Sequence, residues 1–185
     1  MSKLIAFEQV SLDGYFVDAN GDMSWAHKND QELNEFAAKN ASGGSVLVFG
    51  RVTYEMMASY WPTAMAAEQN PVVAEAMGKH PKIVFSRTLD DAAWENTKLI
   101  KGDLTTEIRK LKNVSDLDLV ILGSGSIVSQ LAQVDLIDEY QIIVNPIILG
   151  SGRTLFDGVD HKLSLTLTSN RVFENGNVLL HYSID

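Results

Sequence analysis

The spacing of apolar and polar residues predicts alternating strands and helices through most of the chain. Short apolar runs ending at glycine, serine or asparagine predict strands, and apolar residues three and four apart predict helices. The predicted strands are Leu4–Val10, Val46–Phe49, Lys82–Ser86, Thr97–Ile100, Leu117–Leu122 and Glu139–Asn145. The predicted helices cover about residues 30–40, 52–60, 105–112 and 126–134, with a further short helix from Pro71, and residues 15–29 are expected to be irregular.

The C-terminal segment follows a different pattern. Residues 163–168 alternate leucine with serine or threonine, which is the two-residue period of a strand. Asn175-Gly176 separates this run from the apolar run Val178–Ile184, and Asn-Gly between strands is a strong hairpin signal. We therefore predict one α/β domain over residues 1–185. It has a mixed sheet of about eight strands, parallel in the middle, with helices on both faces and a C-terminal antiparallel hairpin.

Composition narrows the possible partners. A net charge of −9, with no basic run, argues against binding to nucleic acid. The chain has no cysteine, which excludes disulfides and Cys-ligated metals, and its four histidines show no metal-binding spacing. No apolar stretch approaches the roughly 20 residues of a membrane span, and the N-terminus lacks the pattern of a signal peptide. We expect a cytoplasmic protein with no metal, membrane or nucleic-acid partner.

Two predicted strands stop at glycine and turn directly into a helix, at Gly50-Arg51-Val52-Thr53 and at Gly123-Ser124-Gly125-Ser126-Ile127. A helix start exposes free N–H groups at the positive end of the helix dipole, and phosphate binds well there. Arg51 conflicts with that positive end unless an anion binds beside it. The alternatives are a solvated arginine and a tight turn in which Ser126 caps the helix. Ser86-Arg87-Thr88, just past another strand, could add a hydroxyl and a cation.

These three segments, in this order, resemble the cofactor loops of dihydrofolate reductases. Ser11-Leu12-Asp13-Gly14 and the segment 145–156 resemble more closely the C-terminal reductase domain of bifunctional riboflavin-biosynthesis proteins. The resemblance covers nearly the whole chain and implies a dihydrofolate reductase-like three-layer fold. It also implies an NADPH-dependent reductase of a pyrimidine- or pterin-like heterocycle, similar to 5-amino-6-(5-phosphoribosylamino)uracil reductase, and a homodimer.

The resemblance assigns roles to the cofactor loops. Arg51 and Thr53 would bind the cofactor phosphates, and Arg51 with Ser86 or Arg87 would select the 2′-phosphate. The backbone of Gly123–Ile127 would lie against the pyrophosphate. One departure concerns the substrate, because the segment 54–62 lacks the Asp and Arg with which riboflavin-pathway reductases bind the ribityl phosphate. The pathway substrate is therefore in doubt.

The proton donor is not fixed by the sequence. Glu32, or else Asp30, on the first predicted helix corresponds loosely to the carboxylate that holds the pterin in dihydrofolate reductases. In an apolar pocket, desolvation would raise the pKa of that carboxyl. Asn29 or Asp30 can cap this helix. The alternative role of Glu32 is in a capping box, in which Asn29 caps the helix and Glu32 bonds back to it.

Three further residues are candidates for substrate contact. Trp25 could stack on a flat heterocycle, Arg153 could meet a substrate anion, and Asp13 lies in the Ser-Leu-Asp-Gly segment. The alternatives are packing for Trp25, solvent exposure for Arg153 and a turn-forming role for Asp13. Two other functions remain open, namely a dihydrofolate reductase-like activity and a non-catalytic nucleotide- or flavin-binding module.

Overall fold

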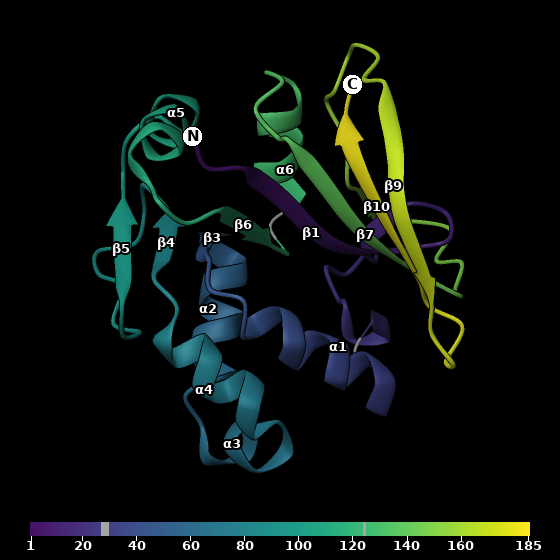
Figure 1. Ribbon diagram of the computed structural model, residues 1–185, viewed down its shortest axis with the longest axis horizontal. Coiled ribbons are helices and arrows are strands. Elements are labelled where there is room, and N and C mark those ends of the chain that lie inside the picture. Colours follow the sequence, from purple (N-terminus) through teal and green to yellow (C-terminus); the bar gives the residue numbers. More distant parts are fainter. Residues whose placement is uncertain (27–29, 124) are drawn as a thin grey trace.

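An eight-stranded mixed sheet forms the middle layer of the protein (Figure 1). In the computed structural model, which describes residues 1–26, 30–123 and 125–185, the strand order is β5-β4-β3-β6-β1-β7-β10-β9. The first six strands in this order are parallel to one another. Strand β10 is antiparallel to β7, and β9 is antiparallel to β10. The strands are β1 (Leu4–Ser11), β3 (Val46–Gly50), β4 (Lys82–Phe85), β5 (Thr97–Ile100), β6 (Leu119–Leu122), β7 (Glu139–Asn145), β9 (Leu165–Val172) and β10 (Val178–Ile184). The short strands β2 (Tyr15–Val17) and β8 (Arg153–Thr154) pair separately.

Helices cover both faces of the sheet. One face packs against α5 and α6 through a core that includes Ile108, Ile121 and Leu131. The other face packs against α1, α2 and α4, with Leu33, Tyr54 and Met77 among the buried residues. The helices are α1 (Gln31–Ala41), α2 (Arg51–Tyr60), α3 (Ala64–Gln69), α4 (Pro71–Lys79), α5 (Leu104–Val114) and α6 (Gly125–Ala132), with a 3₁₀ turn at Ser24–Ala26. The arrangement confirms the predicted three-layer α/β fold.

Asp30 is the N-cap of α1, as one of the two predicted alternatives has it, and its carboxylate accepts a hydrogen bond from the Leu33 N–H at 2.8 Å. Asn29, the N-cap of the alternative capping box, lies outside the described residues. One detail of the sequence prediction is wrong, because residues 15–29 are not wholly irregular but contain β2 and the 3₁₀ turn.

The alternation of leucine with serine or threonine correctly predicted a strand, β9, and all eight residues of β9 are exposed. This strand is the last of the sheet and pairs only with β10 among the described strands. Alternation identifies the two faces of a strand, but it does not reveal whether another layer covers either face.

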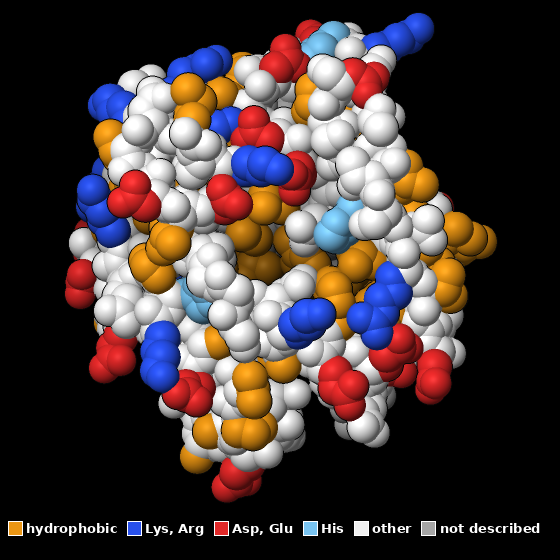
Figure 2. All heavy atoms as spheres, viewed as in Figure 1, with side chains coloured by type: hydrophobic (Ala, Val, Ile, Leu, Met, Phe, Trp, Pro, Cys, Tyr) orange, Lys and Arg blue, Asp and Glu red, His pale blue; other side chains and the backbone are white. Residues whose placement is uncertain are grey.

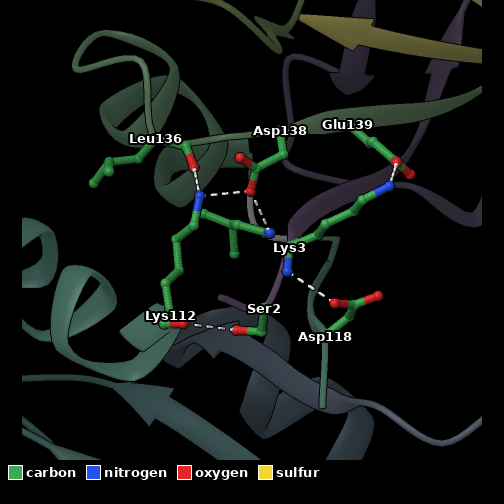
Figure 3. Close-up of polar contacts among 8 residues, drawn as sticks. Ser2, Lys3, Lys112, Asp118, Leu136, Asp138 and Glu139 are labelled. Carbon is green, nitrogen blue, oxygen red and sulfur yellow. Dashed lines mark hydrogen bonds and ion pairs between the residues drawn. The ribbon is translucent and has the colours of Figure 1, made fainter. Parts of the chain in front are cut away.

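Carboxylates hold the amino-terminal end of β1 (Figure 3). Asp118 accepts a hydrogen bond from the Lys3 N–H at 2.8 Å, and Asp138 accepts one from the Leu4 N–H at 2.7 Å. Lys112 of α5 is buried, and its Nζ donates to Asp138 at 2.5 Å and to a backbone carbonyl at 3.0 Å. These bonds hold the amino-terminal end of β1 in place between β6 and β7.

Candidate functional site

The predicted cofactor segments lie along the carboxyl edge of the sheet, which is the side where the parallel strands end. Strands β4, β3 and β6 are adjacent and parallel, so their carboxyl ends meet at the same edge. Gly50–Thr53 joins β3 to α2, Ser86–Arg87 follows β4, and Gly123 follows β6. Ser124 lies outside the described residues. The fold thus brings together three segments that are 36 and 37 positions apart in the sequence, counted from Gly50 to Ser86 and from Ser86 to Gly123.

Thr53 joins two of these segments directly. Its side chain is buried, and its hydroxyl donates a hydrogen bond to the Gly123 carbonyl. A threonine hydroxyl has one hydrogen to donate. In this arrangement Thr53 holds the two loops together, and its hydrogen is not available to a phosphate.

Two arginines at the carboxyl edge have exposed side chains that make only weak contacts with the rest of the protein. Arg51, the first residue of α2, forms an ion pair with Glu55 at 2.9 Å, and both side chains are nearly half exposed. Exposed pairs at i, i+4 contribute only about 0.3–0.5 kcal/mol. Arg87 is exposed, and hydrogen bonds from Thr106, with a smaller effect from the Arg87 charge, lower the pKa of Asp103. Both guanidinium groups can therefore turn to an anion at small cost.

Ser86 is more constrained than its neighbour Arg87. Its hydroxyl oxygen accepts hydrogen bonds from the N–H groups of Thr88 at 3.2 Å and Leu89 at 3.0 Å. The hydroxyl therefore shapes the loop after β4. The Ser86 hydroxyl oxygen lies 3.3 Å from the Thr88 hydroxyl oxygen, a long contact that a bound acceptor could replace.

Gly125 is required by the packing of an aromatic ring. A Cβ on Gly125 would lie 2.6 Å from ring carbons of Phe16. The guanidinium of Arg153 lies over the same ring, 5.2 Å from its centroid. The side of Gly125 on which a Cβ would lie is thus occupied by the Phe16 ring, and the Arg153 guanidinium covers that ring.

Asp13 ties two loops together. Its carboxylate accepts hydrogen bonds from the Ser11 hydroxyl at 2.6 Å, the Leu149 N–H at 3.1 Å and the Gly150 N–H at 2.8 Å. The Ser11 bond, with smaller contributions from the backbone donors, lowers the pKa of Asp13 to about 2. The carboxylate stays ionised at neutral pH and acts as a turn-forming group in this structure.

Glu32 lies against the C-terminal hairpin formed by β9 and β10, at the other end of the carboxyl edge. Its two oxygens accept hydrogen bonds from Arg171 at 2.6 Å and from the Glu174 N–H at 2.9 Å. Arg171 is the main cause that lowers the pKa of Glu32. The expectation of a raised pKa is therefore wrong, because the partner of this carboxyl is a cation and not an apolar wall. Trp25, in the 3₁₀ turn, donates its indole N–H to the Asp22 carbonyl at 3.2 Å.

Two features of the site were missed from the sequence. Glu8 is a carboxyl with 2% of its surface exposed, on β1 beside Ile142 of β7. Its burial could have been predicted, since Leu4, Ala6, Glu8 and Val10 share one face of an alternating strand. The second feature is a cavity of about 290 Å³ between the opposite face of the sheet and α1. Figure 2 shows hydrophobic side chains at the bottom of a hollow on this side of the molecule.

The described residues contain no helix with the length and apolar character needed to cross a membrane. Within the same residues there is also no group of three or more His, Cys, Asp or Glu side chains arranged to hold a metal ion.

Comparison with known families identifies this arrangement. The sequence model of the RibD C-terminal domain family matches residues 2–179. The chain belongs to the RibD C-terminal domain family. Two similar proteins of comparable length are the uncharacterized proteins YyaP and YwjB of Bacillus subtilis (strain 168). YyaP is 25% identical over 94% of this chain and 90% of its own, and YwjB is 26% identical over 97% of each.

Solved structures with the same fold include members of the riboflavin branch and a dihydrofolate reductase. A provisionally named riboflavin biosynthesis protein from Shewanella sp. PV-4 is 27% identical, with a TM-score of 0.78 over 99% of both chains. Dihydrofolate reductase from Enterococcus faecalis, complexed with NADP(H), is 17% identical, with a TM-score of 0.64 over 99% of this chain and 96% of its own. The protein therefore has a dihydrofolate reductase-like fold, as its sequence predicted.

Proposed function

We propose that this RibD C-terminal domain protein is a reductase that binds NADPH at the carboxyl edge of the sheet. The observation that carries the proposal is the convergence of Gly50–Thr53, Ser86–Arg87 and the Gly123 loop on that edge. Two helix starts and two exposed arginines meet there, which suits a phosphorylated dinucleotide. The family membership and the NADP(H) complex of the E. faecalis enzyme support the same ligand. The reaction would take place in the cytoplasm.

Calorimetry with NADPH and NADH tests this proposal. Arg51 and Arg87 can meet the 2′-phosphate, which NADH lacks, through charge-assisted hydrogen bonds. Each such bond contributes about 1.5–3 kcal/mol, so NADPH should bind at least about tenfold more tightly. Equal affinities would remove the 2′-phosphate from the proposal, and no binding of either dinucleotide would remove the cofactor.

One observation favours a non-catalytic nucleotide- or flavin-binding module as the second candidate. Glu32, Asp30 and Asp13, the carboxylates proposed from the sequence, each accept hydrogen bonds from groups of the protein itself. A reductase of this kind also needs a proton source. Oxidation of NADPH, followed at 340 nm with a panel of pterins and pyrimidines, separates the two functions. Tight NADPH binding without turnover on the panel would favour the module.

We also propose that the protein forms a homodimer through β9. Eight consecutive exposed residues on an edge strand leave one side of the backbone ladder open among the described strands. The exposed apolar residues Leu165, Leu167 and Val172 lie on this strand, and two identical edges can pair antiparallel about a twofold axis. Thr168→Pro should give a monomer in light scattering at concentrations where the wild type is dimeric, whereas a dimeric variant would assign the contact elsewhere.

A further inference from the structure

The chain contains two Asn-Gly pairs, and the fold places them in different surroundings. Asn20-Gly21 lies in the loop between β2 and the 3₁₀ turn, and Asn175-Gly176 lies in the turn between β9 and β10. Both glycines have a positive φ, of 80° at Gly21 and 86° at Gly176. The same dipeptide therefore occurs once in a surface loop and once in the hairpin of the sheet, so its chemistry can be compared within one molecule.

An Asn-Gly pair can lose ammonia without any cofactor or catalyst. The main-chain nitrogen of the glycine attacks the side-chain carbonyl carbon of the asparagine, and a new C–N bond closes a five-membered succinimide. The side-chain amide leaves as ammonia and takes up the proton of the glycine nitrogen. Water then opens the ring at either carbonyl and gives aspartate or isoaspartate. Glycine favours this reaction because it has no Cβ to hinder the approach of its nitrogen.

The surroundings of Asn20 suit this reaction. The side chain of Asn20 and the whole of Gly21 are exposed, and a Cβ on Gly21 would meet no described atom within 4 Å. The hydrogen bonds that order the loop are local. The Asn20 N–H donates to the Asp18 carboxylate at 2.8 Å, and the Gly21 N–H donates to the Asp18 carbonyl at 3.0 Å. Such a loop can open without disturbing the sheet, and water reaches both reacting groups.

The surroundings of Asn175 oppose the same reaction. Its side-chain oxygen accepts a hydrogen bond from the Asn177 N–H at 2.9 Å, and its side-chain nitrogen is buried. The Gly176 N–H donates to the Phe173 carbonyl at 3.0 Å, and the Phe173 N–H donates to the Asn177 carbonyl at 2.9 Å. The Phe173 side chain is itself buried in the core. The hairpin must therefore open, with loss of contacts in the core, before the Gly176 nitrogen can attack.

We propose that Asn20 is a site of spontaneous deamidation in the folded protein, and that the fold protects Asn175 from the same modification. The product is a carboxylate between Asp18 and Asp22, and it makes the protein one charge more negative. The Asp18 carboxylate accepts hydrogen bonds from the N–H groups of both Asn20 and Asp22, so a second carboxylate beside it weakens the loop by repulsion. The isoaspartate form also lengthens the main chain of the loop by one carbon.

Peptide mapping by mass spectrometry tests the proposal on the complete chain, incubated at mildly alkaline pH. The peptide that contains Asn20 should gain the mass difference between an amide and a carboxylic acid. In the folded protein this change should be at least about tenfold faster than at Asn175, since a tenfold difference needs only about 1.4 kcal/mol of protection by the hairpin. In concentrated urea, where the hairpin is absent, the two sites should react at similar rates.

Three variants sharpen the test. Asn20→Ser should abolish the modification in the folded protein, whereas Asn175→Ser, the same change at the other pair, should leave the rate at Asn20 unchanged. Phe173→Leu loosens the packing beneath the hairpin and should raise the rate at Asn175 alone. If Phe173→Leu does not fold, the comparison between folded wild type and urea still measures the protection. Equal rates at the two sites in the folded wild type, or an intact Asn20 after a time that modifies both sites in urea, would overturn the proposal.

Discussion

Buried lysines lie at the amino-terminal edge of the sheet, and exposed arginines lie at its carboxyl-terminal edge. Lys112 donates to Asp138 and a carbonyl, and Lys82 donates to three carbonyls at the end of α4, at 2.7, 2.8 and 3.2 Å. Arg51 pairs weakly with Glu55, and Arg153 lies over the Phe16 ring. The ammonium groups of the buried lysines already have hydrogen-bond acceptors and are shielded from water, so they serve to hold the strands. An exposed guanidinium, in contrast, can exchange its protein partner for a ligand.

The buried setting also changes the chemistry of the lysine. Burial lowers the pKa of Lys82 to about 8, although its ammonium lies 4.6 Å from the centroid of the Trp94 ring. The carboxyl edge uses arginine, which stays charged over the whole physiological range. The two edges therefore differ in kind of cation as well as in exposure, and the following variants test whether one edge serves stability and the other binding.

Asp138→Ala should have the largest effect on stability. It leaves the buried Lys112 ammonium without its carboxylate and also frees the Leu4 N–H. Because 40% of the Asp138 side chain is exposed, we expect a loss of about 2–3 kcal/mol, below the roughly 3–5 kcal/mol of a fully buried pair. The melting temperature should fall by about 4–12 °C, with NADPH affinity unchanged. Asp116→Ala, at an exposed position of the loop between α5 and β6, is the control and should change stability by less than about 0.5 kcal/mol.

Gly125→Ala should have the second largest effect. The new methyl would lie 2.6 Å from the Phe16 ring, and such overpacking costs about 1–3 kcal/mol. A second substitution, Phe16→Leu, should restore the melting temperature, because it removes the ring carbons involved. Gly78→Ala on α4, where a Cβ meets nothing within 4 Å, should instead stabilise by about 0.5–1 kcal/mol. A Gly125→Ala protein as stable as the wild type would show that Phe16 does not pack there.

Glu32→Gln should have an effect that depends on pH. Arg171 lowers the folded-state pKa of Glu32 below its ordinary value of 4.5, so the ionised carboxylate stabilises the fold. This contribution is fully present above about pH 4.5 and is lost as the pH falls through the folded-state pKa. The difference in melting temperature between wild type and variant should therefore shrink from pH 7 to pH 3, whereas Glu68→Gln, at an exposed position, should show no such trend. A difference that grows at low pH would restore the raised pKa expected from the sequence.

Arg51→Ala should have the smallest effect on stability. It removes an exposed ion pair, so the free energy of unfolding should change by no more than about 0.5 kcal/mol. NADPH affinity should nevertheless fall at least about tenfold, because a charge-assisted phosphate contact is lost. Arg109→Ala, an exposed arginine on α5, should change neither quantity. Together with Asp138→Ala, this variant would separate binding from stability, and a large loss of stability in Arg51→Ala would contradict the contrast between the edges.

The order of elements was predictable because local patterns determine it. Strand ends at Gly50 and Gly123 placed the loops at one edge, since parallel strands end together, and Asn175-Gly176 correctly marked the hairpin between β9 and β10. The short strands β2 and β8 were missed because two or three residues are too few to show a period. Helix α3 was missed because its Ala- and Met-rich sequence has no distinct polar face.

Contacts between distant segments were not predictable from the sequence. Phe16 and Gly125 are 109 positions apart, and the partner of Glu32 is Arg171, 139 positions away. The cavity forms where side chains from several distant segments leave space between α1 and the sheet. The sequence of any one of these segments does not predict that space. Only Glu8 carried a local signal, because strand alternation places it with the apolar residues of β1.

The exposed edge of β9 has a consequence for the colloidal behaviour of the protein. In a molecule whose β9 is not paired in the proposed dimer, the backbone ladder can accept a strand from any neighbouring molecule, and at neutral pH the net charge of −9 keeps unpaired molecules apart. This repulsion vanishes near the isoelectric point of about 4.8. Solubility should therefore be lowest near that pH, and the precipitate should be rich in intermolecular β-structure.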